Sequence, residues 1–430
     1  MWDNLINMKD KSIKEIIAEY KITSVDILGG EILHERHNNS KHRVIVTDAV
    51  MGAGKTQKAI MKMKAMVEAN QKFLYVTPFL GEIARVRKKI AEVKEPYFGN
   101  DGEYGTLKTK RAKFLEQLEA GEYIATTHSM FSSLMEEDYK KMTEYTLILD
   151  EVIQPMELVK VALDDLEMLK RSGLISVDKV TGRILFTNED YWGVYSALKK
   201  KCDSSAVYLF NNTILVWAFP PVIFTTFKRI QVLTYMFGGS LLSAYFELNK
   251  ISYHIEKHND AQYREDIKKK LNIYDGVSNK IGGRDNAFSV GWLKNKLPDF
   301  FKKTKFSSSH IVSKVFDTNT KETAYTTFKA FQTKLAGAGY TRGFIPITSR
   351  STNEFMHKRT MLYFGNRYLP PPLLNYFLSH DIDVDIDKWA LAEMLQWLWR
   401  GCIRNGEPMN IFIPSYRMRK LLLDWLDGKY

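Results

Sequence analysis

Two glycines, a lysine and a threonine stand together in the stretch DAVMGAGKTQKAI, which begins at Asp48. The segment before it, RVIVTDA, is apolar and β-branched, which predicts a buried strand. After the glycines, apolar residues recur at helical spacing, namely Ala59, Ile60, Met63, Met66 and Val67. This order of strand, glycine-rich turn and helix favours a phosphate loop. Glycines let backbone N–H groups converge on an anion, and the helix N-terminus adds further donors.

The side chains of this turn predict ATP with Mg²⁺ as the bound cofactors. Lys55 would reach the β- and γ-phosphates, and the hydroxyl of Thr56 would bind Mg²⁺. The stretch 49–56 reads A-V-M-G-A-G-K-T, so alanine stands where the general pattern begins with glycine. The residues expected to surround the nucleotide are Ala49, Gly52, Ala53, Gly54, Lys55 and Thr56.

A pair of carboxylates follows a second apolar run, YTLILDEV. The run predicts a buried strand that ends at Asp150 and Glu151. Ligands of open α/β sheets bind at the carboxyl edge of the strands, where both side chains would lie. We therefore expect Asp150 to hold Mg²⁺ through water, and Glu151 to orient and deprotonate an attacking water.

The form A-x-x-G-x-G-K-T resembles the first motif of superfamily 2 helicases. The resemblance implies that two strand-to-loop segments, KFLYVTPFLGEIARV and EYIATTHSMF, contact a nucleic-acid backbone. The residues implied for these contacts are Thr77, Pro78, Arg85, Thr127 and His128. Taken singly, a histidine such as His128 is more often an ordinary loop residue. VLTYMFGGSLLSAYF resembles the third motif, although Leu233-Thr234-Tyr235 stands where Ser-Ala-Thr is usual.

Two segments of the C-terminal half extend the resemblance. In DKWALAEMLQWLWRGCIR, Asp387 could cap a helix with a buried stripe made of Leu391, Leu395, Leu398 and Cys402. A glutamine and two arginines repeat every four residues on another face and resemble the arginine-finger helix of the sixth motif, namely Gln396, Arg400 and Arg404. The usual gap between these arginines is three, and the alternative is a surface helix with scattered charge. TSRSTNEF resembles the fifth motif and implies strand contacts by Arg350, Thr352 and Asn353.

The order of these motifs implies an α/β fold with two RecA-like lobes, each a parallel sheet with flanking helices. We expect the first lobe at 35–245, the second at 246–430 and a short helical arm at 1–34. An inserted α/β element at about 155–218 would lie on the first lobe. It contains two predicted hairpins, ISVDKVTGRILF and AVYLFNNTILVW, with turns at Thr181-Gly182 and Asn211-Asn212. The forms RSTNEF and QWLWRGCIR are most similar to a phage-encoded branch of superfamily 2.

Composition narrows the possible partners and the compartment. The formal net charge of +12 favours polyanions, because neutralised phosphates release counterions. Only Cys202 and Cys402 are present, without metal-ligand spacing, which indicates a reducing cytoplasm. The N-terminus lacks a signal-like apolar core, and ILVWAFPPVIF is too short and proline-broken for a membrane span. The alternating aspartates of SHDIDVDIDKW are either a metal-binding strand or a lead-in to the next helix; we favour the lead-in.

Together, these features predict an ATP-dependent helicase or translocase that acts on single-stranded or forked DNA, in phage DNA replication or recombination. A packaging-type motor ATPase is one alternative, and a catalytically inactive nucleic-acid-binding clamp is another. A protein partner would supply specificity, since no sequence-reading helix or zinc finger stands out.

Overall fold

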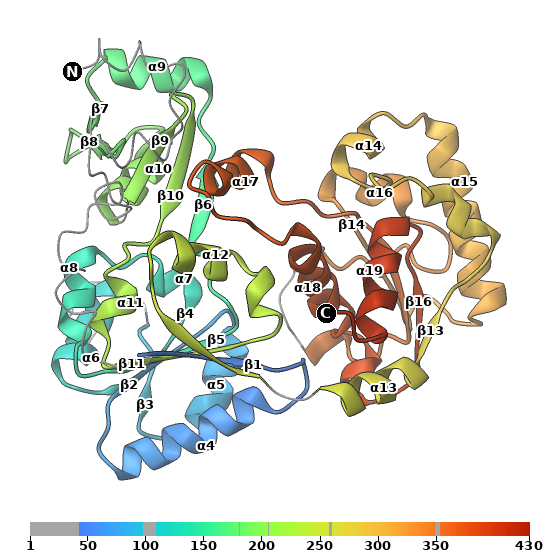
Figure 1. The fold of residues 1–430 in the computed structure, drawn as a ribbon, viewed down its shortest axis with the longest axis horizontal. Coiled ribbons are helices and arrows are strands. Elements are labelled where there is room, and N and C mark those ends of the chain that lie inside the picture. Colours follow the sequence, from blue (N-terminus) through green and yellow to red (C-terminus); the bar gives the residue numbers. More distant parts are fainter. Residues whose placement is uncertain (1–42, 98–108, 180, 205, 258–259, 349–352) are drawn as a thin grey trace, which may run out of the picture.

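The computed structural model describes residues 43–97, 109–179, 181–204, 206–257, 260–348 and 353–430 (Figure 1). The predicted arm at 1–34 and two predicted strand contacts, Arg350 and Thr352, lie outside the described residues. Within the described ranges, no helix combines the length and the apolar character needed to cross a membrane.

The first lobe contains a parallel sheet, which has seven strands in the described part of the chain. Their order is β12-β1-β11-β5-β2-β4-β3, and all neighbouring pairs run parallel. The strands are β1 (Val44–Asp48), β2 (Phe73–Thr77), β3 (Val93–Lys94), β4 (Tyr123–Thr127), β5 (Thr146–Asp150), β11 (Arg229–Thr234) and β12 (Tyr253–Lys257). Only β11 separates β1 from β5. The glycines after β1 and the carboxylates at the end of β5 therefore meet at one sheet edge.

The helices of this lobe follow the apolar spacing of the sequence. α4 (Lys55–Glu68) buries Ala59, Ile60, Met63 and Met66, as the spacing after the glycines predicted. The other helices here are α5 (Leu80–Lys89), α6 (Lys110–Glu119), α7 (His128–Phe131), α8 (Glu136–Tyr139), α11 (Ile223–Thr226) and α12 (Leu241–Leu248).

The segment expected as an insertion has its own small sheet beside the first lobe (Figure 1). The antiparallel strands β6 (Met156–Val159), β10 (Ile214–Ala218) and β9 (Ala206–Phe210) form it, and α9 (Leu163–Arg171) and α10 (Ser196–Ser204) accompany it. Both predicted hairpins are present, β9-β10 and β7 (Ile175–Val177) with β8 (Ile184–Phe186). Asn211 and Asn212 have φ of 47° and 59°, the left-handed conformation that a tight hairpin turn needs.

The second lobe has a smaller parallel sheet. Its order is β13-β16-β15-β14, with β13 (Leu271–Ile273), β14 (Thr323–Thr327), β15 (Thr360–Phe364) and β16 (Met409–Phe412). The accompanying helices are α13 (Ala261–Lys270), α14 (Val290–Lys294), α15 (Pro298–His310), α16 (Gln332–Leu335), α17 (Pro371–Leu378), α18 (Ile386–Leu398) and α19 (Tyr416–Leu426).

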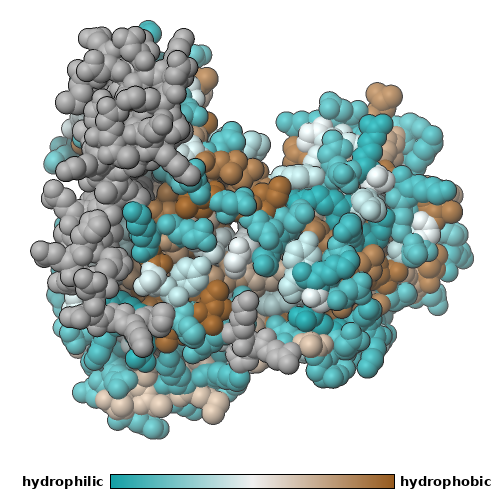
Figure 2. All heavy atoms as spheres, viewed as in Figure 1, coloured by the Kyte–Doolittle hydropathy of each residue, from teal (hydrophilic) through white to brown (hydrophobic). Residues whose placement is uncertain are grey.

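Two elements cross the boundary that we expected at 245. β12 pairs with β1, so the first sheet continues to Lys257. α17 packs on the inserted sheet, where the ring of Tyr376 meets Phe210 edge-on at a centroid distance of 5.2 Å. Apolar side chains gather around α17 on the visible face, between the insertion and the second lobe (Figure 2). Such pairings join residues far apart in the chain, which is why local patterns did not predict them.

The aspartate-rich segment before α18 leads into a capped helix, but the cap is not the residue we expected. Asp385 is the N-cap, and its carboxylate accepts a hydrogen bond from the Lys388 N–H at 2.8 Å. Asp387, the predicted cap, lies in the first turn and forms an ion pair with Arg417 at 2.6 Å. The cap therefore lies two residues earlier than the sequence indicated, because the side chain of Asp387 is engaged by an arginine that is distant in the chain.

Candidate functional site

The glycine turn, residues 49–56, joins β1 to α4. Gly52 and Gly54 have φ of 87° and 79°, in the left-handed region that side chains with a Cβ rarely adopt. Gly54 is the N-cap, so α4 begins at Lys55 with its first N–H groups directed at the turn. The N–H of Ala49 bonds to the Thr234 carbonyl at 3.0 Å, which anchors the turn to β11. The turn therefore has the backbone geometry of an anion cradle.

Lys55 folds back over this turn. Its Nζ donates to the Ala49 carbonyl and to the Val50 carbonyl, the latter at 3.0 Å. Burial lowers the pKa of Lys55 to about 8, although the carboxylates of Asp150 and Glu151 oppose the shift. The ammonium group is thus held by weak neutral acceptors, which an incoming phosphate can replace with a stronger ionic contact.

Asp150, at the end of β5, faces the start of α4. The Thr56 hydroxyl lies 3.2 Å from both carboxylate oxygens, and the Tyr75 hydroxyl donates to one of them at 2.5 Å. Burial raises the pKa of Asp150, while the hydrogen bonds from Tyr75 and Thr56 work in the opposite direction. A hydroxyl and a carboxylate in contact are the hard oxygen donors that Mg²⁺ prefers. Thr56 and Asp150 could therefore hold this ion.

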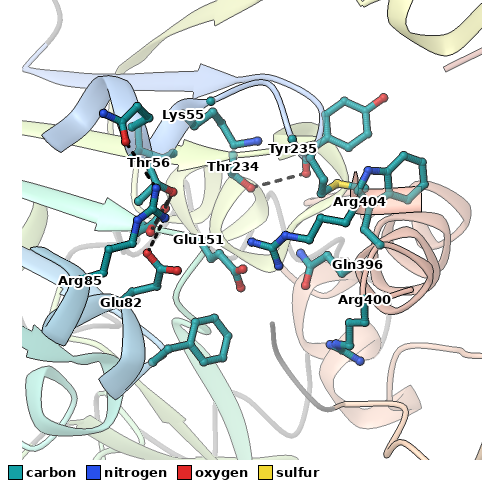
Figure 3. Close-up of a pocket in the computed structure, with 18 residues that line it drawn as sticks. Lys55, Thr56, Glu82, Arg85, Glu151, Thr234, Tyr235, Gln396, Arg400 and Arg404 are labelled. Carbon is teal, nitrogen blue, oxygen red and sulfur yellow. Dashed lines mark hydrogen bonds and ion pairs between the residues drawn. The ribbon is translucent and has the colours of Figure 1, made fainter. Parts of the chain in front are cut away.

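Glu151 has an unusual backbone conformation. Its φ of 66° is left-handed, which costs a residue with a Cβ roughly 1–3 kcal/mol. The Glu151 N–H bonds to the Leu233 carbonyl at 3.0 Å, so β11 holds the turn in place. The turn directs the carboxylate into the space between the lobes (Figure 3). Strain retained at this position is typical of functional residues.

One cavity of about 250 Å³ brings the two halves of the predicted site together. From the first lobe it is lined by most of the glycine turn, by both carboxylates and by a part of β11; the predicted Ala49 and Ala53 are not in the lining. From the second lobe it is lined by Gln396, Trp399, Arg400 and Arg404. The second-lobe residues follow the glycine turn by more than 300 positions in the chain, and they face it across this cavity, as is common for pockets at domain interfaces.

The prediction that Gln396, Arg400 and Arg404 share one helical face is wrong. α18 ends at Leu398, and Arg404 lies in a separate short 3₁₀ helix at Cys402–Asn405. The helix ends because the chain passes close to β15. The Cys402 N–H bonds to the Lys358 carbonyl at 2.9 Å, and a Cβ on Gly401 would meet that carbonyl at 3.0 Å. The predicted buried stripe is confirmed on α18 for Leu391, Leu395 and Leu398, all 0% exposed, whereas Cys402, also 0% exposed, lies in the following 3₁₀ helix.

The two arginines differ in direction. Arg404 is half-buried and extends its guanidinium group from the second lobe toward Glu151, with Gln396 beside it (Figure 3). Arg400 is only 2% exposed, and its guanidinium group lies on the far side of Gln396 from that of Arg404 (Figure 3). Arg404, which follows Arg400 by four residues where three are usual, is thus the arginine that reaches toward the first lobe.

The residues implied for nucleic-acid contact do not form one surface. Thr77 is 0% exposed at the end of β2, so its hydroxyl is closed to a strand, and this prediction is corrected. Arg85 instead lines the cavity between the lobes, where it forms an ion pair with Glu82 at 3.0 Å. Thr127 caps α7 by accepting from the Met130 N–H at 3.2 Å.

The remaining predicted contacts lie near the ends of strands and short helices. Pro78 is half-buried directly after β2. His128 begins α7, and its Nε2 lies 3.2 Å from the Asp150 carbonyl oxygen. Asn353 begins a short 3₁₀ helix at Asn353–Phe355, directly after residues that the structure does not describe.

Tyr263 connects the glycine turn to the second lobe and was missed at the level of sequence. Its hydroxyl donates to the Met51 carbonyl at 2.8 Å and accepts from the Trp399 indole N–H at 3.3 Å. Trp399 packs edge-on against Trp425 at 5.6 Å, and the Trp425 indole donates to the Tyr235 hydroxyl at 2.6 Å. Aromatic residues dispersed over the chain carried no local signal of this connection. Glu82, Gln57 and Phe79, which also line the cavity, were likewise missed.

The strand orders and the cavity between the lobes define a two-lobed α/β protein of RecA-like architecture. The sequence is 35% identical over 414 residues to the SPbeta prophage-derived uncharacterized protein YonV of Bacillus subtilis (strain 168), an alignment that covers 90% of this chain and 99% of the relative. Residues 265–426 match the YonV C-terminal Rossmann-like domain, and residues 156–217 match the YonV middle domain. The chain belongs to the YonV family.

Three solved structures are similar at low identity. Xpd4 of S. tokodaii is 13% identical and covers 96% of this chain and 97% of its own, with a TM-score of 0.45. A DEAD box protein from the hyperthermophile Methanococcus jannaschii is 11% identical; the match covers 90% of this chain and 86% of that protein, with a TM-score of 0.28. The Sulfolobus solfataricus SWI2/SNF2 ATPase core in complex with dsDNA is 10% identical; the match covers 86% of this chain and 83% of that protein, with a TM-score of 0.27.

Proposed function

We propose that the protein is an ATPase whose activity depends on nucleic acid and drives movement along a DNA strand. The observation that carries this proposal is the shared cavity. Lys55, Thr56, Asp150 and Glu151 line it from the first lobe, opposite Arg404 from the second. A lysine on a glycine turn, two carboxylates and a facing arginine are the groups that phosphoryl transfer to water requires.

Each group has a task that its surroundings support. Lys55 and the N-terminus of α4 would bind the β- and γ-phosphates, and Thr56 and Asp150 would hold Mg²⁺, which neutralises charge on the phosphate oxygens. Glu151 would accept a proton from the attacking water. Arg404 would stabilise negative charge on the transferred group when the lobes close. A catalytically inactive clamp would need neither Glu151 nor a facing arginine.

The charge of the chain and its relative support a nucleic-acid partner. A net charge of +12 favours a polyanion, and the prophage origin of the YonV relative supports a role in phage DNA metabolism. We propose the following division: a first lobe to Lys257 with the middle domain at 156–217 inserted, and a second lobe from Ala261 onward.

Phosphate release from ATP in the presence of Mg²⁺ tests the proposal. We expect release to rise when single-stranded or forked DNA is added, and the same panel should include duplex DNA and RNA. Lys55→Ala should abolish both basal and stimulated release, because the γ-phosphate loses its positive contact in the first lobe. DNA-stimulated release that persists in Lys55→Ala, purified in the same way as the unaltered protein, would refute the proposal.

The lowered pKa of Lys55 predicts a pH-dependent nucleotide affinity. The free protein loses the Lys55 charge as pH rises through about 8. Affinity for ATP should therefore fall above pH 8 by up to about tenfold per pH unit, since only the charged form binds the phosphates well. Equilibrium titration between pH 7 and about pH 9.5 measures this. Lys55→Arg, which stays charged throughout, should show no such fall; a flat profile for the unaltered protein would contradict the prediction.

Removing the Tyr263 hydroxyl should weaken nucleotide binding. Tyr263→Phe deprives both the Met51 carbonyl and the Trp399 indole of a partner. One net hydrogen bond is worth about 0.5–1.5 kcal/mol, so we expect roughly a two- to tenfold loss of affinity. Tyr325→Phe is the matched control, because its hydroxyl also bonds a backbone carbonyl, that of Gln332 at 3.2 Å, away from the cavity. Equal effects of the two variants would indicate a general loss of stability.

A further inference from the structure

We propose that a second cavity, between the first lobe and the middle domain, binds a segment of single-stranded nucleic acid. The inference rests on the proposed function and adds a path for the strand. The cavity has a volume of about 400 Å³, within the range of roughly 300–1,000 Å³ that is usual for ligand sites. None of its described lining residues lines the nucleotide cavity.

The two walls of the cavity come from different parts of the fold. The first lobe contributes α7 and the turn after it, where Ser129 and Ser133 are exposed. The middle domain contributes Lys200 from α10 and Trp217 from β10. Gln154, in the segment that follows β5, completes the lining between them. Any ligand held here contacts both the motor lobe and the inserted domain.

The chemistry of the lining fits a nucleotide unit of a strand. Lys200 is an exposed cation on the rim, suited to a phosphate oxygen. Its neighbour Lys201 is ion-paired with Glu157 and lies 5.2 Å from the ring centroid of Trp217. Trp217 and Ile153 are buried and form an apolar floor under the cavity, while the exposed Gln154 side chain offers a hydrogen-bonding group. An exposed lysine with hydroxyl and amide side chains around it is the kind of surface that contacts phosphate and sugar without reading sequence.

The cavity is connected to the catalytic turn by His128. This residue lines the cavity, and its Nε2 lies 3.2 Å from the Asp150 carbonyl oxygen, immediately before Glu151. A strand that contacts His128 can therefore shift the strained turn at Glu151 through one hydrogen bond. This gives a physical route by which a bound strand would stimulate hydrolysis.

A matched pair of lysine variants tests the site. Lys200→Gln and Lys199→Gln change the charge equally on the same helix, but Lys199 does not line the cavity and is ion-paired with Asp203 at 2.5 Å. Binding of a fluorescein-labelled oligothymidine to the full chain should weaken about tenfold in Lys200→Gln, the effect of one charge-assisted hydrogen bond. The slope of log affinity against log salt concentration should decrease in magnitude by about 0.7, which is the contribution of one phosphate contact on a single strand. Lys199→Gln should match the unaltered protein, and basal phosphate release should be unchanged in both variants.

The outcomes separate this inference from the proposed function. If both variants bind the oligonucleotide like the unaltered protein, the strand does not pass through this cavity. The proposed function is then still tested separately, by DNA-stimulated phosphate release and its loss in Lys55→Ala. If thymidine monophosphate displaces the oligonucleotide at equal nucleotide concentration, the cavity binds a small phosphorylated ligand and the inference is overturned. If the unaltered protein binds no oligonucleotide at all, the nucleic-acid dependence itself fails.

Discussion

Glu151→Gln is expected to reduce DNA-stimulated phosphate release by about 10²- to 10⁴-fold, the usual contribution of a general base. The amide keeps the size of the side chain but cannot accept a proton from water. ATP affinity should stay close to that of the unaltered protein, because Lys55, Thr56 and Asp150 are intact. Steady-state phosphate release and equilibrium nucleotide binding, measured on the same preparation, separate the two effects.

Glu82→Gln is the matched control for this prediction. Glu82 lines the same cavity and carries the same charge, but it forms an ion pair with Arg85. We expect turnover of Glu82→Gln to remain within a few-fold of the unaltered protein. If Glu82→Gln were the inactive variant and Glu151→Gln the active one, the assignment of the base would be reversed. The loss of activity in Glu151→Gln also cannot come from a destabilised backbone if its thermal unfolding is unchanged.

Arg404→Ala should abolish stimulated turnover while ATP affinity in the first lobe is mostly retained. Arginine fingers contribute about 10³–10⁵ in rate in GTPases, and the same charge stabilisation is available here once the lobes close. A solvated arginine without a role would change stability or activity by no more than about 0.5 kcal/mol. Arg404→Lys should restore only part of the rate, because an ammonium group lacks the planar fork of guanidinium.

Arg400→Ala provides the comparison within the same segment. The resemblance to the sixth motif included Arg400 as well as Arg404, and we still expect the loss of Arg400 to impair stimulated turnover. Its 2% exposure predicts an additional loss of thermal stability, because a buried side chain is removed. Arg404, which is more exposed, should lose activity without that loss of stability. Full stimulation in Arg404→Ala together with none in Arg400→Ala would return the role to Arg400.

The sequence by itself determined the elements whose cause is local. The strand, glycine turn and helix at 44–68 follow from β-branched residues, two left-handed glycines and apolar spacing within a few turns. The position of Asp150 and Glu151 at the end of a buried strand follows from the run of apolar residues before them. The two hairpins of the middle domain follow from Asn-Asn and Thr-Gly turns between short strands. Each of these depends on neighbours in the chain.

Only the tertiary structure decided the features that depend on distant neighbours. Helical spacing continued through Arg404, but the close approach of Gly401 to Lys358 ends α18 at Leu398 and sends the two arginines in different directions. Thr77 is closed to solvent because strands and helices from elsewhere cover the end of β2. The Tyr263 hydroxyl reaches the glycine turn across the lobes. Local periodicity fixes which residues can form a helix or strand, whereas packing between remote segments fixes where that element stops and what its side chains meet.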